Sequence, residues 1–263
     1  MVDNHVHLDI AREGEEALPT ADAIAAAAAV GVTRLVQVGC DPAGVRLTGE
    51  MVQEHPALLG GVAVHPNEVP RLAATGELDD ALAEVEALTS HSRIRVVGET
   101  GLDYFRTGPD GIPLQQNAFR WHIDLAKRTG LALQIHDRDA HDDVMRILDE
   151  EGAPSHTVLH CFSGDARMAR AAVERGYLLS FAGTVTFKNA TGLRDALAVT
   201  PLEHLLVETD APYLTPTPHR GATNASYLVP LTVRAMAGVL TVDVPTLCTA
   251  ISANSERVYG AWG

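Results

Sequence analysis

The chain has 263 residues, of which 46% are hydrophobic and 21% are charged, and its formal net charge is −14. This length suits one α/β barrel, which needs about 250 residues. No apolar run reaches the roughly 18 residues expected of a transmembrane helix. The acidic excess disfavours a protein that coats nucleic acid through phosphate contacts, because such binding relies on Lys and Arg. It leaves room for a nuclease that engages phosphate locally through metal ions.

The termini and the cysteines give expectations about location. The N-terminus has no basic stretch followed by an apolar one, so we expect the first strand to belong to the mature core. Cys40, Cys161 and Cys248 are odd in number and widely separated, which argues against a disulfide framework and favours a reducing compartment. We therefore predict a cytoplasmic protein that does not enter a membrane, and the sequence does not give its oligomeric state.

Strand-like and helix-like stretches alternate from the first residues onward. Short apolar runs rich in Val, Ile and Leu, mostly without alternation, are typical of parallel strands buried on both faces. They cover residues 2–8, 33–39, 59–65, 94–99, 131–136, 157–161, 177–182 and 204–210. Helical patterns with start or stop signals lie between or after them, at residues 20–31, 77–90, 115–130, 140–152, 166–176, 189–199, 225–240 and 252–260.

This alternation predicts an α/β protein with a (β/α)8 TIM barrel. No linker or break in composition divides the chain, so residues 1–263 are predicted to form a single domain. An open, doubly wound sheet is the alternative, but it gathers side chains only near a switch point. Candidate site residues on the first, fourth, fifth, sixth and eighth strands converge more naturally in a closed barrel.

Five of the apolar runs end in residues that bind metals. Each such residue stands at the carboxyl end of its predicted strand, where barrel enzymes place catalytic groups. They are His5, His7, Glu99, His136, His160 and Asp210. The first two are spaced so that both side chains project to the same face of a strand. A lone residue of this kind is more often structural, but six in the same relative position predict a metal site.

The donor set limits the metal. Three histidines and one or two carboxylates around each cation suit Zn, Mn, Co or Ni, whereas Mg prefers more oxygen ligands. We expect one or two divalent cations, with Mg, Mn or Zn as the candidates. Glu99 is the natural bridge between two ions, because a carboxylate can offer one oxygen to each.

The chain as a whole resembles a known family. Eight blocks occur in order from end to end: "DNHVHLD", "GVAVHPNE", "VVGETGLDYFR", "QIHDRDA", "VLHCFSGD", "SFAGTVTFKNA", "ETDAPYLTP" and "HRG". They are similar to the TatD-related DNases, metal-dependent hydrolases of the amidohydrolase superfamily. The resemblance implies a TIM barrel, a divalent metal site and hydrolytic activity that is usually described as DNase.

The resemblance also implies roles for individual residues. It makes the six residues above the metal ligands, with Asp210 as the base on the attacking water. His65, in "AVHP", would lie beside the metals and contact the scissile phosphate. Arg220 in "HRG" is a candidate phosphate contact, because its planar guanidinium matches phosphate oxygens. Asp103 and Tyr104 could reach the pocket or order the loop. Glu208 is predicted to orient a ligand.

The chain departs from the family pattern at two places. The family commonly continues after "HRG" with Asn-Glu-Pro, whereas here Asn224 is followed by Ala225 and Ser226. Asp137 stands where a small hydroxyl residue is usual. Neither change touches a predicted ligand, so both bear on substrate preference.

Three functions compete. The leading hypothesis is metal-assisted hydrolysis of a phosphodiester, with DNA or another phosphodiester as partner. The second is hydrolysis of an amide or ester, such as an aminoacyl ester on RNA; branches of the superfamily with a carboxylated Lys place it on the fourth strand, where this chain has Glu99. The third is a metal-binding module without catalysis, which the intact ligand set disfavours.

Overall fold

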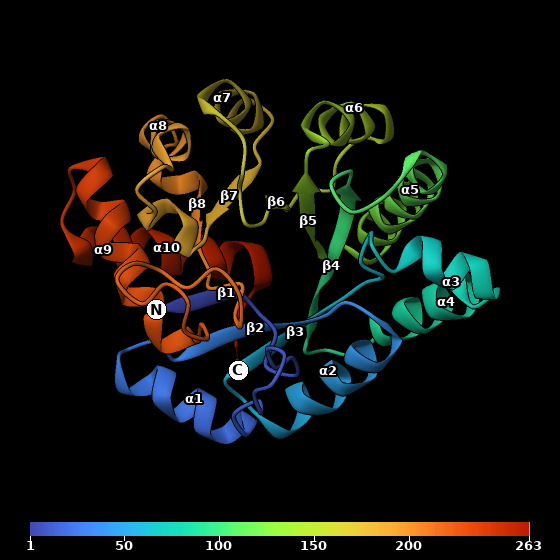
Figure 1. The fold of residues 1–263 in the computed structure, drawn as a ribbon, viewed down its shortest axis with the longest axis horizontal. Coiled ribbons are helices and arrows are strands. Elements are labelled where there is room, and N and C mark those ends of the chain that lie inside the picture. The colour runs from blue at the N-terminus through green and yellow to red at the C-terminus, as the bar shows by residue number, and fades with distance from the viewer. Residues whose placement is uncertain (263) are drawn as a thin grey trace. The chain divides into compact units, whose positions relative to one another are not determined.

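The computed structural model describes residues 1–262 and contains all eight predicted strands (Figure 1). They hydrogen-bond as parallel neighbours in chain order. A parallel bridge between Val6 and Ala211 links the first strand to the residues after the eighth. The fold is a nearly closed (β/α)8 barrel, as predicted. The strands are β1 Val2–Val6, β2 Arg34–Gly39, β3 Leu58–Val62, β4 Ile94–Asp103, β5 Ala132–Arg138, β6 Thr157–Leu159, β7 Leu178–Phe181 and β8 Leu205–Val207.

Helices follow or separate the strands, and several end where their sequence signals predict. Gly130 ends α5 at φ 70°, a left-handed conformation that glycine adopts readily. The α-helices are α1 Thr20–Ala29, α2 Pro42–Glu54, α3 Val69–Thr75, α4 Leu78–Leu88, α5 Ile112–Thr129, α6 His141–Glu151, α7 Ala166–Glu174, α8 Thr191–Ala198, α9 Val229–Leu240 and α10 Val244–Tyr259. Short 3-10 turns lie at η1 Pro109–Gly111, η2 Gly183–Thr186, η3 Leu202–His204 and η4 Ser226–Leu228. Of the α-helices, α2 and α3 occupy stretches where the sequence predicted no helix.

Several strand ends differ from the sequence prediction. β1, β3, β6 and β8 stop before His7, His65, His160 and Asp210, so these four residues lie in the loops that follow. β4 instead runs past Glu99 to Asp103, because its extra residues continue to pair with β5. The point at which each strand ends depends on its pairing with neighbouring strands. A local apolar pattern carries no information about that pairing.

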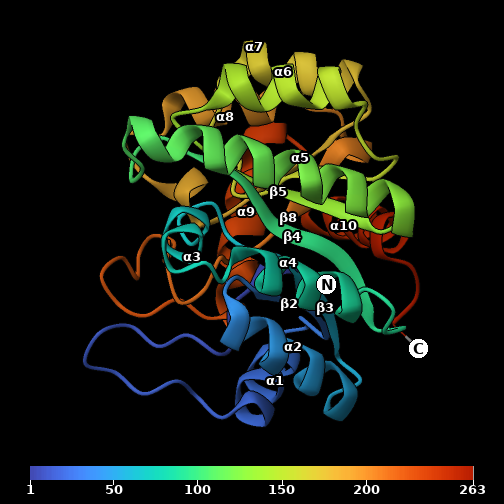
Figure 2. The same cartoon turned by 90° about the vertical axis from the view of Figure 1, so that its right-hand side faces the viewer.

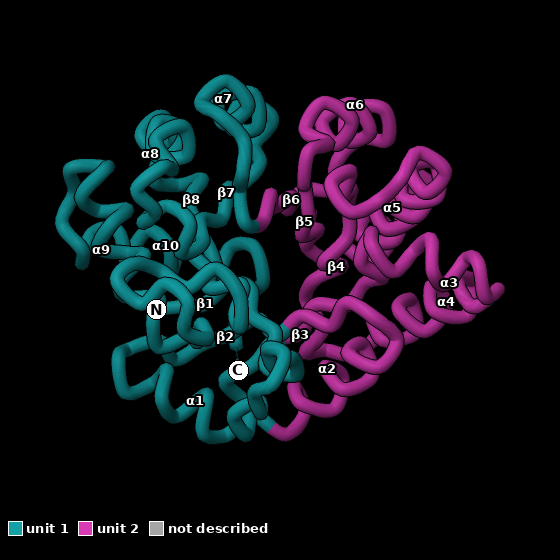
Figure 3. The backbone as a smooth tube through the Cα atoms, viewed as in Figure 1, with its two compact units in different colours: residues 1–37, 55–59, 161–263 teal, residues 38–54, 60–160 magenta. Residues whose placement is uncertain are grey.

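The residues group into two compact units, drawn in different colours in Figure 3. Unit 1 holds residues 1–37, 55–59 and 161–263, and unit 2 holds residues 38–54 and 60–160. The single domain over residues 1–263 stays a prediction.

In unit 1, α10 is fixed to two strands by buried polar side chains. The Asn254 amide donates to the carbonyls of Leu202 and Leu205, each at 2.8 Å. The Ser255 hydroxyl donates to Asn4 Oδ1 at 2.8 Å. These bonds satisfy polar groups that are buried, and they hold β1 in place next to His5.

In unit 2, α5 runs along β4 and β5 (Figure 2). Its buried face carries Phe119 and Ile123, and also His122. The Val64 amide donates to His122 Nε2 at 3.2 Å. Burial lowers the pKa of His122 to about 4, so this imidazole is neutral.

Within residues 1–262, no single helix is both long and apolar enough to cross a membrane. The bent pair Ser226–Leu240 and Val244–Tyr259 reaches that length and composition only when its two helices are taken together.

Candidate metal centre

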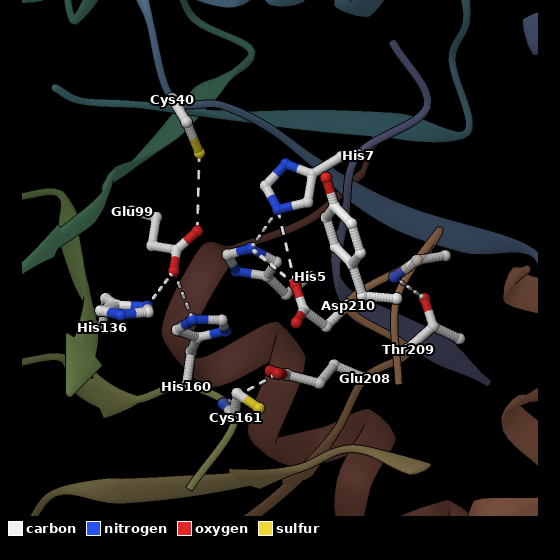
Figure 4. A network of polar contacts seen from close by, with 12 residues as sticks. His5, His7, Cys40, Glu99, His136, His160, Cys161, Glu208, Thr209 and Asp210 are labelled. Atoms are coloured by element: carbon white, nitrogen blue, oxygen red, sulfur yellow. Dashed lines mark hydrogen bonds and ion pairs between the residues drawn. The ribbon is translucent and has the colours of Figure 1, made fainter. Parts of the chain in front are cut away.

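Two clusters of metal-binding side chains are present, one in each unit, and Figure 4 labels all of their residues except His65. The first, which we call the N-terminal cluster, consists of His5, His7 and Asp210. His5 Nε2 lies 3.2 Å from His7 Nε2. Asp210 Oδ1 lies 3.5 Å from His7 Nε2 and 3.9 Å from His5 Nε2. One donor atom from each residue therefore lies within 4.8 Å of the others, close enough to share a cation.

The backbone brings these three residues together. Asp210 donates its amide to the carbonyl of His5 at 3.0 Å, and His7 donates to the carbonyl of Ala211 at 2.9 Å. Asp210 has φ 54°, a left-handed conformation that Asp tolerates better than most residues. The loop after β8 thus runs beside the end of β1 and presents its carboxylate to both imidazoles.

A buried carboxyl group fixes the residue before Asp210. Thr209 donates its amide and its hydroxyl to Asp3, at 2.9 and 2.6 Å. Burial raises the pKa of Asp3 to about 7, although the bonds from Thr209 act in the opposite direction. The turn that carries Asp210 is therefore held by a polar contact inside unit 1.

The second group, the glutamate cluster, places three imidazoles around Glu99. Oε1 of Glu99 lies 2.6 Å from His136 Nδ1 and 2.8 Å from His160 Nε2. His65 Nε2 is 3.4 Å from the same oxygen. Burial alone would raise the pKa of Glu99, but the charges of His160 and His65 and the bonds from His136 and His160 hold it well below its usual value.

Asp103 holds the far side of the His136 ring. Its Oδ2 lies 3.2 Å from His136 Nε2 and accepts from the Asn67 amide at 3.0 Å, while Oδ1 accepts from the Arg106 amide at 2.9 Å. Burial disfavours charge on both partners, yet these bonds lower the pKa of Asp103 and, with Glu99, raise the pKa of His136 to about 9. A carboxylate on one ring nitrogen leaves the other, Nδ1, directed at Glu99, where it could bind a metal.

Gly101 is a positioning residue that the sequence analysis missed. It has φ 132°, and a Cβ built on it would lie 2.1 Å from the carbonyl oxygen of His136. Its register partner in β5 is His136 itself. Only glycine permits this approach of β4 to β5, and the "GETGLD" spacing after the predicted ligand was the available signal.

The remaining predicted residues lie as follows. The Tyr104 hydroxyl donates to Asp143 at 2.7 Å and accepts from Gln116 at 2.7 Å, so it braces α5 against α6. The Arg220 guanidinium lies 3.9 Å above the Phe187 ring. Substrate contacts by Asp103, Tyr104, His65 and Arg220 stay predictions.

Glu208 contacts the backbone beside His160, a predicted ligand. Its Oε1 accepts from the Cys161 amide at 2.8 Å, directly after His160 (Figure 4). Cys161 has φ 42°, an unfavourable conformation for a residue with a Cβ, and this bond helps to hold it.

A family model described as TatD related DNase matches residues 2–260. The chain belongs to this family. Among TatD-family relatives, it is 45% identical to the "Uncharacterized metal-dependent hydrolase TatD" of Mycobacterium tuberculosis, covering 99% of this chain and 98% of the relative. It is 33% identical to the "Uncharacterized metal-dependent hydrolase YabD" of Bacillus subtilis, covering 98% of each. The chain is thus a metal-dependent hydrolase of the TatD family.

Solved structures agree on the fold. The TatD homologue YJJV from Escherichia coli K12 aligns with a TM-score of 0.88 at 24% identity, covering 99% of this chain and 98% of that one. The organophosphorus hydrolase from Deinococcus radiodurans aligns with a TM-score of 0.65 at 14% identity, covering 99% and 92%. The chain thus shares its barrel fold with both proteins.

Proposed function

We propose that this chain is a divalent-metal-dependent deoxyribonuclease that cleaves phosphodiester bonds. The observation that carries the proposal is the donor set: a buried glutamate with three imidazoles, and two imidazoles with an aspartate, in a chain of the TatD-related DNase family. Imidazole and carboxylate donors suit Zn, Mn or Co, and two clusters suit two cations. Phosphodiester cleavage is a common use of two-metal sites.

The spacing of the donor atoms fits a cation. Two nitrogen or oxygen ligands about 2.0–2.1 Å from a tetrahedral ion stand roughly 3.3 Å apart. The separations of His5 from His7 and of Glu99 from His65 are 3.2 and 3.4 Å. His136 and His160 lie closer to Glu99, at 2.6 and 2.8 Å, and would move back by less than about 1 Å to admit an ion. Binding would displace the proton shared by Glu99 and His136.

The residues divide the chemistry among them. A bound cation would supply positive charge for the phosphate and lower the pKa of a water molecule. Asp210 accepts the proton that this water loses. His65, whose side chain is 15% exposed, contacts the phosphate. Arg220 neutralises phosphate charge through its guanidinium. Asp103 keeps the His136 ring in position through its contact with Nε2.

The test is hydrolysis of single- and double-stranded DNA oligonucleotides by protein that has been stripped with a chelator and reloaded with Zn, Mn, Co or Mg. Glu99→Gln and His160→Ala are compared with wild type, and His91→Ala is the control, because His91 is exposed and lies outside both clusters. We expect hydrolysis by wild type and the control alone. Equal hydrolysis by all four proteins would contradict the proposal.

A second candidate is hydrolysis of an ester or amide, such as an aminoacyl ester on RNA. The net charge of −14 favours it, because a long polyanion gains little from so acidic a protein. A panel of small esters and amides, run beside the DNA substrates with the same variants, separates the two. Turnover of the panel without DNA cleavage would replace the first proposal with this one.

A further inference from the structure

Cys40 is a residue of a metal-binding type, and it lies outside the eight blocks that carry the family resemblance. It follows β2 directly and is half-buried. Its Sγ lies 3.5 Å from Oε2 of Glu99, whereas His136 and His160 lie nearest Oε1 (Figure 4). His65 also approaches Oε1, at 3.4 Å. The thiol and the imidazoles thus approach different oxygens of one carboxylate.

The backbone holds Cys40 in this place. Its carbonyl accepts from the amide of His65 at 2.8 Å, and the carbonyl of Gly39 accepts from Ala63 at 3.3 Å. A Cβ on Gly39 would meet the carbonyl oxygen of Gly44 at 2.4 Å, so the chain is tightly packed just before the thiol. The position of Cys40 is therefore tied to that of His65, a member of the glutamate cluster.

The separation of sulfur and oxygen has the value expected for two ligands of one ion. With a metal–sulfur bond of about 2.3 Å and a metal–oxygen bond of about 2.0 Å, tetrahedral ligands stand roughly 3.5 Å apart. Sγ and Oε2 are 3.5 Å apart. A weak S–H···O hydrogen bond would have a similar length, so the two explanations must be separated by experiment.

We propose that Cys40 is a metal ligand on the Oε2 side of Glu99, and that its sulfur biases the centre toward Zn, Co and Cd over Mg and Mn. The inference rests on the metal site of the proposed function. On binding, the S–H bond breaks, its proton passes to solvent and a metal–sulfur bond forms, with no change of oxidation state. A soft thiolate selects such metals, whereas harder ions prefer carboxylate and water.

The full chain loaded with Co(II) provides the test, because a cobalt–thiolate bond gives a charge-transfer band in the near ultraviolet. We expect this band in wild type and in Cys248→Ser, a control that removes a free thiol elsewhere. Cys40→Ser should lose the band yet still bind Co(II). Its preference for Zn over Mn, measured by competition, should fall by about 10-fold or more. Cys161→Ser, next to His160, should keep the band.

A measurement on the unmodified protein guards against a variant that folds poorly. Zn should slow alkylation of Cys40 by iodoacetamide and leave the alkylation of Cys248 unchanged, as followed by mass spectrometry of peptides. Bound Co(II) without the band, or a band that persists in Cys40→Ser, would overturn the assignment of Cys40 and leave the proposed function intact. A chain that binds no Co(II) or Zn would overturn both.

Discussion

The N-terminal cluster and the glutamate cluster differ in how closely their imidazoles and carboxylates approach each other within their own units. In the glutamate cluster, one carboxylate oxygen lies within hydrogen-bonding distance of His136 and His160, and Asp103 supports the His136 ring from behind. In the N-terminal cluster, the two imidazoles approach each other at 3.2 Å while Asp210 stays 3.5 Å or more away. In the glutamate cluster, carboxylates thus contact imidazoles closely. In the N-terminal cluster, the short contact joins the two imidazoles, and the carboxylate lies farther from both.

Because of this difference, we expect protons to compete with a cation to different extents in the two clusters. Protons can bridge the donors of the glutamate cluster, so a cation there competes with protons. In the N-terminal cluster, the Asp210 carboxylate stands 3.5 and 3.9 Å from the two imidazoles, so a proton shared with this carboxylate competes less strongly with a cation. We expect the N-terminal cluster to keep its metal at lower pH than the glutamate cluster.

Removing the central carboxylate gives the largest effect. In Glu99→Gln the three imidazoles lose their anionic partner, so activity and metal binding at the glutamate cluster should each fall by more than about 100-fold, the upper range for losing only a supporting residue. Metal content by mass spectrometry and DNA hydrolysis are the readouts. The same metal content in Glu99→Gln as in wild type would contradict the central role of Glu99 in the glutamate cluster.

Asp103→Asn tests the support of His136. An amide no longer offers the negative charge that fixes the ring, so metal affinity should fall by about 10- to 100-fold. Titration calorimetry with Zn measures the affinity, and the exposed Asp110→Asn in η1 is the control. If Asp103 contacts substrate, as the sequence left open, KM would rise and metal affinity would not change.

Gly101→Ala tests the close approach of the two strands. The added Cβ would collide with the His136 carbonyl at a φ that alanine rarely adopts, so the free energy of unfolding should fall by about 1–3 kcal/mol. Urea denaturation measures this loss. Gly108→Ala, in the loop after β4, meets no atom within 4 Å and is the control. An equal loss in both variants would count against this role of Gly101.

The smallest expected effect is a pH-dependent change in stability caused by His122, a residue of unit 2 that is not a predicted metal ligand. Since the pKa of His122 is lowered to about 4, its contribution to stability is complete above its unfolded value of about 6.5 and is lost as pH falls from there toward 4. In metal-loaded protein, wild type should lose about 2 kcal/mol relative to His122→Gln between pH 7 and pH 4.5. Denaturant midpoints at both pH values measure the difference. Parallel pH profiles would show that His122 does not protonate on unfolding.

Part of this protein could be predicted because its signals are local. The strands could be found because each is a short run of Val, Ile and Leu, and the alternation with helices led to the barrel. The ligand types could be found because imidazole and carboxylate are uncommon at the ends of such runs. The ends themselves were less predictable: His65, His160 and Asp210 lie beyond their strands, because strand length is set by pairing with a neighbour.

The sequence by itself determined the barrel, the family and the residue types that can hold a cation. The tertiary structure alone decided that Asp103 faces His136, that Gly101 lets β4 approach β5, and that Cys40 lies beside Glu99. It also decided that His122, on a helix with polar neighbours, is buried and neutral. The physical reason is distance along the chain: apolar periodicity and turn signals act between near neighbours, whereas the partner of a buried polar group comes from a different strand or helix.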